Sequence, residues 1–172
     1  MRSVLAVLAV VLAVSGYAQA ADTPGLFQGV PWGTSLKEMK RRYPGGHSQK
    51  RGDDGQLQYG VVLEIAGRKN AIAVLGFDRA NQFQRACVLF PKAGTPVDWS
   101  KPTTPEPPEE AAATWAMLLK LLQQEYGPGF AYKTGGMLWN FANGTIFLSP
   151  RSDGETAAVV YSAPNAPSIS GL

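Results

Sequence analysis

Apolar residues recur with the helical period in two segments of the chain. In the first segment Leu36, Met39 and Tyr43 share one face, and a Pro-Gly-Gly sequence directly after Tyr43 ends the helix. Ser35 and Glu38 form a Ser-x-x-Glu capping box, in which each side chain satisfies a backbone N–H at the helix start. Because this helix is short, its stability has to come from docking on a core.

The second helical segment begins at Glu109 and Glu110, where the helix dipole favours acidic side chains. It ends at Gly127-Pro128, a glycine and proline pair typical of helix ends. Its predicted apolar face is wider than that of the first helix, so we expect it to be the better buried. The residues of this face are Trp115, Leu118, Leu119, Leu122 and Tyr126, with Met117 and Leu121 at its margins.

Apolar and polar residues alternate elsewhere, as they do in strands with one buried face. The short loops between these segments favour antiparallel meanders, and Asn143-Gly144 is a strong hairpin signal. Residues 26–30 form a possible edge strand, whereas the polar stretch from His47 to Gly55 has no strand pattern and contains the turn signal Asp53-Asp54-Gly55. The strand segments are 57–65, 71–77 and 83–90 before the second helix, and 130–133, 137–141, 145–148 and 156–162 after it.

Each half of the chain therefore contains a helix that ends in tyrosine and is followed by strand candidates, three in the first half and, besides the short strand at 130–133, three in the second. This order predicts an α+β fold, in which an antiparallel sheet from two α-β-β-β units carries two helices packed on one face. We expect a single domain over 21–162, with a proline-rich surface loop at 91–108 and a flexible tail at 163–172.

The N-terminus has the features of a signal peptide over residues 1–20. Arg2 provides the positive charge, Val4–Val14 the apolar run, and Ala18-Gln19-Ala20 the small-x-small cleavage pattern. The apolar run of 11 residues is shorter than the ~20 that a membrane-spanning helix needs, which argues against a retained anchor. No cysteine lies near the cleavage site, which excludes a bacterial lipoprotein. We expect the periplasm as the location, with secretion as the alternative, and no transmembrane span after cleavage.

Composition and charge restrict the chemistry. The chain has 16 Lys+Arg and 13 Asp+Glu, a net charge of +3 that does not suggest nucleic-acid binding. Cys87 is the single cysteine and His47 the single histidine, which excludes multi-cysteine zinc sites and two-histidine metal sites. Cys87 lies in an apolar strand segment, where we expect it to be buried.

No group of residues forms a recognisable catalytic pattern. The chain has no G-x-S-x-G sequence, and His47 beside Ser48 does not make a triad. Glu64 fits a solvated sheet face, and Asp53-Asp54-Gly55 lacks the other ligands of a calcium loop. We therefore predict no catalytic, cofactor-binding or metal-binding residue and no enzymatic activity.

The charge is concentrated between Lys37 and Arg51, where six cations accompany one acid, Glu38. We predict partner contacts at the cations of the first helix, and at Trp99 in the proline-rich loop. The expected partner is an acidic protein or an anionic envelope surface. The alternatives are an ordinary solvated helix face, and a Trp99 that fastens its loop to the domain. The cations of the helix are Lys37, Lys40, Arg41 and Arg42.

The segment Phe27-Gln28-Gly29-Val30-Pro31-Trp32-Gly33-Thr34-Ser35-Leu36-Lys37-Glu38 resembles the opening of small exported bacterial proteins of unassigned function. Gly76-Phe77-Asp78-Arg79-Ala80-Asn81-Gln82-Phe83 looks like their second recurring stretch. The resemblance implies an envelope location and no particular activity. The order of elements is similar to that of outer-membrane assembly lipoproteins and β-lactamase-inhibitor proteins, which act by binding other proteins.

These observations predict an exported, non-enzymatic binding or protein-interaction module. A carrier of a small apolar or sugar ligand is the first alternative. A hydrolase or lyase that uses scattered carboxylates is the second.

Overall fold

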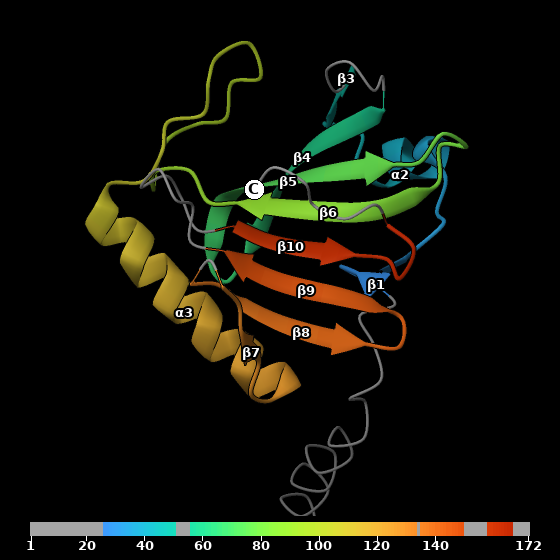
Figure 1. Cartoon of the computed structure of the whole chain (residues 1–172). Helices are drawn as coiled ribbons and strands as arrows, with labels where there is room; N and C mark the ends of the chain where they lie inside the picture. The colour runs from blue at the N-terminus through green and yellow to red at the C-terminus, as the bar shows by residue number, and fades with distance from the viewer. Residues whose placement is uncertain (1–25, 51–55, 134, 150–157, 167–172) are drawn as a thin grey trace, which may run out of the picture.

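The computed structural model describes residues 26–50, 56–133, 135–149 and 158–166. The predicted signal peptide and most of the predicted tail lie outside these residues. The described part is an α+β fold with an eight-stranded antiparallel sheet, two helices and a small two-stranded hairpin (Figure 1). The predicted α+β class with an antiparallel sheet is thereby confirmed. Within the described residues no helix has the length and apolar character to cross a membrane.

The sheet has the strand order β3-β4-β5-β6-β10-β9-β8-β7. Every neighbouring pair is antiparallel, so β3 to β6 form one meander and β7 to β10 form another. The last strands of the two meanders, β6 and β10, join them in the middle of the sheet. The strands are β3 (His47–Lys50), β4 (Leu57–Ile65), β5 (Arg68–Phe77), β6 (Phe83–Leu89), β7 (Phe130–Ala131), β8 (Met137–Phe141), β9 (Gly144–Ser149) and β10 (Ala158–Ser162).

The predicted α-β-β-β unit has one strand too few, because four strands follow each helix: the polar stretch that begins at His47 contains strand β3, and the short strand predicted at 130–133 is β7. This strand pairs with β4 at one edge of the sheet, from His47 opposite Gly60 to Lys50 opposite Leu57. The side chains of His47, Ser48 and Gln49 are all exposed, so neither face of β3 had to be apolar. Backbone pairing with β4, supported by a hydrogen bond from the Gln49 side chain to that of Gln58 at 3.2 Å, makes this segment a strand, which a hydrophobic pattern does not reveal.

Both helices cover the same face of the sheet, which we call the inner face. Helix α2 (Leu36–Arg42) lies over β4, since the Tyr59 hydroxyl donates to the carbonyl of Tyr43 at the helix end. Helix α3 (Pro108–Tyr126) ends over β8, where the Trp139 indole donates to the Gly127 carbonyl at 2.9 Å. A continuous row of paired residues connects these two points, and they are Tyr59, Leu75, Ala86, Tyr161, Ile146 and Trp139.

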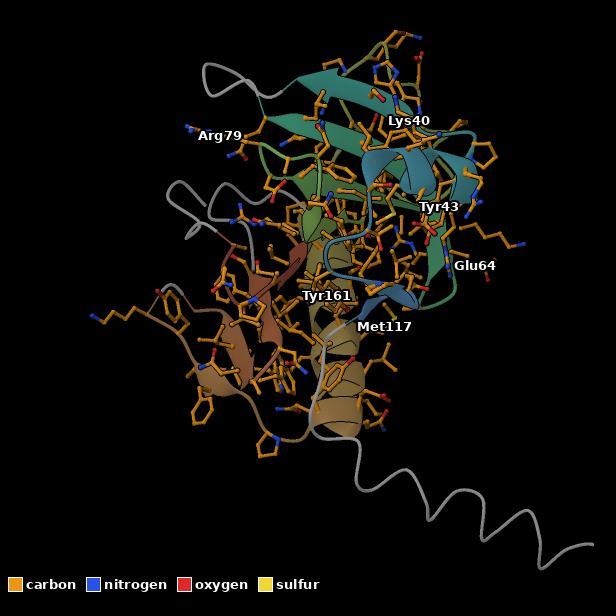
Figure 2. All side chains as sticks on the ribbon, turned by 90° about the vertical axis from the view of Figure 1, so that its right-hand side faces the viewer. Lys40, Tyr43, Glu64, Arg79, Met117 and Tyr161 are labelled. Atoms are coloured by element: carbon orange, nitrogen blue, oxygen red, sulfur yellow. The ribbon has the colours of Figure 1, made fainter. Side chains whose placement is uncertain are left out.

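Figure 2 shows how the inner face is filled. Tyr161 of β10 and Met117 of α3 project into the layer between sheet and helices, whereas Glu64 and Arg79 lie at the periphery. Met39 of α2 is fully buried in the same apolar cluster, as the sequence predicts. Leu121 of α3 is 43% exposed, so the buried face of this helix is narrower than predicted.

The opposite face, which we call the outer face, carries a second row that spans all eight strands. Its members are directly opposite one another in register, and they are His47, Gly60, Val74, Cys87, Val160, Phe147, Leu138 and Phe130. Cys87 is half-buried, which differs from the predicted full burial. The reason is its place on the outer face, away from the cluster that the helices cover.

Two short segments complete the fold. The predicted edge strand at 26–30 is a tight hairpin of β1 (Leu26–Phe27) and β2 (Val30–Pro31). Gln28 and Gly29 connect them, both with positive φ angles. At the other end of the chain, Ala163 donates its backbone N–H to the Gln84 carbonyl, so the first residues of the predicted tail are attached to β6.

Candidate functional site

The cations predicted to contact a partner lie on α2, a helix whose start and buried face are held by short-range contacts. The Ser35 side chain accepts a hydrogen bond from the Glu38 backbone N–H at 3.3 Å, which confirms half of the predicted capping box. Met39 is the fully buried residue of the helix, and Leu36 and Tyr43 pack beside it. This anchoring turns the rest of the helix surface to solvent.

Lys37, Lys40 and Arg41 project from this surface and are exposed. Lys40 lies over the Tyr59 ring, 6.0 Å from its centroid. Arg41 approaches the Glu38 carboxylate at 3.4 Å, but with side-chain exposures of 82% and 58% this pair contributes little to stability. An external anion can therefore bind all three cations, because the contacts that they make within the protein are weak.

Arg42 has a different role from its three neighbours. Its guanidinium donates to the Gln28 carbonyl at 3.1 Å, and it lies 5.9 Å from the Tyr43 ring centroid. It thereby fastens α2 to the β1–β2 hairpin. We define the basic face of α2 as Lys37, Lys40 and Arg41. The two remaining cations of the predicted basic segment, the Lys50 side chain and Arg51, lie outside the described residues.

Trp99, the other predicted contact residue, fastens the proline-rich loop to the outer face of the sheet. Its ring is stacked on His47 with centroids 5.8 Å apart and planes inclined by 13°. It also covers Gly60 so closely that a Cβ built on this glycine would lie 2.6 Å from two of its ring carbons. Trp99 thus packs against β4 at a position where any side chain larger than that of glycine would clash with its ring.

The structure does not combine the basic face and Trp99 into one surface. Tyr59 points to α2 on the inner face, whereas its neighbour Gly60 meets Trp99 on the outer face. Successive side chains of a strand point to opposite faces, so β4 separates the two features. The basic face of α2 and Trp99 are therefore two separate candidate contacts.

A buried ion pair that the sequence did not indicate lies at the base of the proline-rich loop. The Arg68 guanidinium donates to a Glu106 carboxylate oxygen at 2.6 Å and to the Pro91 carbonyl at 2.6 Å. The Thr114 hydroxyl of α3 donates to the same Glu106 oxygen at 2.9 Å. The Glu106 side chain has no exposed surface and that of Arg68 is 20% exposed. We call Arg68, Glu106 and Thr114 the Arg68–Glu106 lock, because it connects β5, the loop and α3.

The lock determines what Glu106 can do chemically. A general acid or base has to reach the proton that it transfers. The Glu106 carboxylate is closed off from solvent, and one of its oxygens already accepts from both Arg68 and Thr114. We therefore assign it a structural role. In the described part of the chain, no group of three or more His, Cys, Asp or Glu side chains could hold a metal ion.

Two tyrosines near the α3 end of the inner face are titratable groups in an apolar environment. Burial raises the pKa of the Tyr161 phenol far above its usual range, and the nearby Tyr126 adds to the increase. Burial also raises the pKa of Tyr126, with a smaller contribution from Glu125. Tyr161 packs against Phe27, with ring centroids 5.3 Å apart, so β10 and the β1–β2 hairpin share this cluster.

The raised pKa of Tyr161 predicts a loss of stability at alkaline pH. The folded state keeps the proton more tightly than the unfolded state, so this contribution is complete below the ordinary value of 10.0 and is lost as the pH rises above it. Denaturant unfolding on both sides of that pH measures the decrease. The Tyr161→Phe variant is expected to show a shallower decrease, and an equal decrease in both proteins would contradict the assignment.

Comparisons of the chain with protein-family models, with curated proteins and with solved structures gave no match. The resemblance of residues 27–38 to small exported bacterial proteins therefore stays a prediction. What the chain does has to be argued from its own surfaces.

Proposed function

We propose that the protein is an exported, non-enzymatic binding module of the bacterial envelope, which docks on an acidic protein segment through the basic face of α2. The observation that carries the proposal is the exposure of Lys37, Lys40 and Arg41 on a helix that is fixed in place. The signal peptide predicted at residues 1–20 supports the location.

An acidic protein fits this surface better than a lipid bilayer does. Helices that lie in a membrane interface bury an apolar face among the lipids. The apolar residues of α2, Leu36, Met39 and Tyr43, already pack against the core. Only charge remains for the contact, and a flexible acidic segment can bring its carboxylates to the three cations.

The two halves of the chain support a related proposal about its architecture. We infer that they are similar units, each a helix followed by an antiparallel meander, in a four-strand version of the predicted α-β-β-β scheme. The support is the pairing of β6 with β10, which places the equivalent last strands of both units side by side. The basic face belongs to the first unit only, because α3 ends without a basic residue in its last turn.

The proposed function is tested with a labelled poly-glutamate peptide whose binding is followed by fluorescence anisotropy. The variant Lys37→Ser/Lys40→Ser/Arg41→Ser is expected to bind about tenfold more weakly, since exposed charge contacts contribute roughly 0.5 kcal/mol each. Arg42 is left in place because it holds the β1–β2 hairpin. Binding to the unmodified protein should weaken steeply with salt, as the screening length falls from ~10 Å at 0.1 M to ~3 Å at 1 M.

The matched control replaces three exposed cations elsewhere, Lys69, Arg79 and Lys120, with serine. It removes the same charge and should retain binding. Equal weakening in both triple variants would show a general charge effect and contradict the assignment to α2. Binding to phosphatidylglycerol vesicles but not to the peptide would contradict the choice of a protein partner.

A further inference from the structure

The sheet ends at β7 in an open edge that carries aromatic side chains. Among the strands that the structure describes, this strand pairs only with β8, and residues 130–133 are all exposed. Phe130 is 68% exposed and Tyr132 51% exposed, which makes them the two most exposed large apolar residues of the described chain. Open edges of this kind are templates for pairing with another strand, and proteins usually protect them.

The backbone of β7 leaves one residue with both its polar groups free for such pairing. Phe130 is opposite Leu138, and the Tyr132 N–H donates to the Gly136 carbonyl at 2.8 Å, so both residues direct their main chain toward β8. Alternate residues of a strand direct their N–H and C=O groups to opposite sides. The N–H and C=O groups of Ala131 therefore point out of the sheet at its open edge.

The aromatic side chains beside Ala131 are on the outer face, away from α3. Phe130 belongs to the outer row with Leu138 and Phe147. The Tyr132 ring meets the edge of the Phe147 ring, with centroids 5.3 Å apart and planes inclined by 73°. This contact holds Tyr132 in a defined position, and it leaves about half of its surface exposed to a partner.

We propose that β7 pairs with the β7 strand of a second copy of this chain, antiparallel and about a two-fold axis at Ala131. In this register, the Ala131 N–H of each copy donates to the Ala131 carbonyl of the other, as in the hydrogen-bonded pair of an antiparallel ladder. Phe130 then lies opposite Tyr132 of the second copy, and Tyr132 opposite Phe130. Such cross-strand aromatic pairs stabilise sheets.

The surroundings of β7 support a second copy as its occupant. Lys133 falls opposite Gly129 of the second copy, so no like charges are opposed in this register. Each copy contributes two aromatic side chains and the backbone of one residue, a small contact beside the ~1,200–2,000 Å² of a stable interface, so we expect a weak and reversible dimer. The basic face of α2 is near the other edge of the sheet, so it stays uncovered and this inference does not rest on the proposed function.

Sedimentation velocity over a series of concentrations measures the association. The unmodified protein should form dimers as its concentration rises, whereas Phe130→Ser/Tyr132→Ser should raise the dimer dissociation constant at least tenfold. Ala131→Pro, which removes the edge N–H and keeps both aromatic residues, should weaken the dimer as well. The control Val62→Ser changes another exposed apolar residue, 43% exposed on β4, and should leave the dimer unchanged.

A disulfide tests the register. In a Cys87→Ala background, Ala131→Cys should form a cross-linked dimer under mild oxidation, because opposite residues of a hydrogen-bonded pair have Cα atoms ~5.5 Å apart. Lys133→Cys is the matched control, since the two copies of this residue would be displaced by roughly 13 Å along the strands. Equal cross-linking of both variants, or a protein that stays monomeric at all concentrations, would overturn the proposal. Monomers that still bind foreign peptides at this edge would assign it to strand addition by another protein.

Discussion

Replacing Arg68 with alanine is expected to lower the free energy of unfolding by about 3 kcal/mol, the largest effect that we predict for a single side chain. The substitution leaves the Glu106 carboxylate, which has no exposed surface, without the guanidinium that lies 2.6 Å away. It also removes the hydrogen bond to Pro91 that holds the start of the proline-rich loop. Chemical denaturation of the two proteins, followed by circular dichroism, measures the difference.

Two further variants test whether the effect of Arg68→Ala comes from the unpaired buried charge. Lys101→Ala breaks the exposed pair with Asp98 in the same loop, 3.0 Å apart, and should change the stability by less than ~1 kcal/mol. The double variant Arg68→Met/Glu106→Leu replaces both charges with apolar side chains, so it should be more stable than Arg68→Ala. If Arg68→Ala unfolds at the denaturant concentration of the unmodified protein, the lock does not stabilise the fold.

The second large effect is expected at Gly60, where an alanine should displace Trp99. The added Cβ would lie 2.6 Å from two ring carbons, a distance that forces the ring to move. Since Trp99 is in a loop, we expect it to leave both Gly60 and His47, at a cost of about 1–3 kcal/mol in stability. Tryptophan fluorescence should show greater solvent exposure of the indole.

Gly45→Ala is the matched control for this substitution. No atom lies within 4 Å of a Cβ built on Gly45, so the added methyl meets nothing. The variant should keep the fluorescence and nearly all the stability of the unmodified protein. A Gly60→Ala protein with unchanged fluorescence would show that the loop accommodates the methyl group without releasing Trp99.

The parts of the fold that the sequence predicted well are those in which one face is buried. The alternation over 57–65 predicted β4, with Tyr59 and Val61 in the core. The sequence predicted a hairpin loop at Asn143-Gly144. The observed loop is one residue earlier, at Ala142-Asn143, because Phe141 pairs with Gly144. Strand β3 was missed because the side chains of His47, Ser48 and Gln49 are exposed, so no hydrophobic alternation marks it.

The candidate sites differ in whether a local sequence pattern marks them. The basic face of α2 follows from helical spacing within a few residues, and the sequence predicted its exposed cations. The Arg68–Glu106 lock joins residues 38 positions apart, and no local spacing relates them. The one sequence feature that points to this contact is the position of Glu106 between two prolines, at residues 105 and 107, which hold the acid in a fixed place in the loop.

The central position of β10 has a consequence for how the chain reaches its folded state. The sheet cannot close until residues 158–162 enter between β6 and β9, although helix α3 and strands β7 to β9 separate them from β6 in the sequence. Pairing between such distant segments is slow, because the loop-closure entropy is lost before the contact forms. Under the proposed export, this delay keeps the polypeptide unfolded and able to pass through a translocation channel.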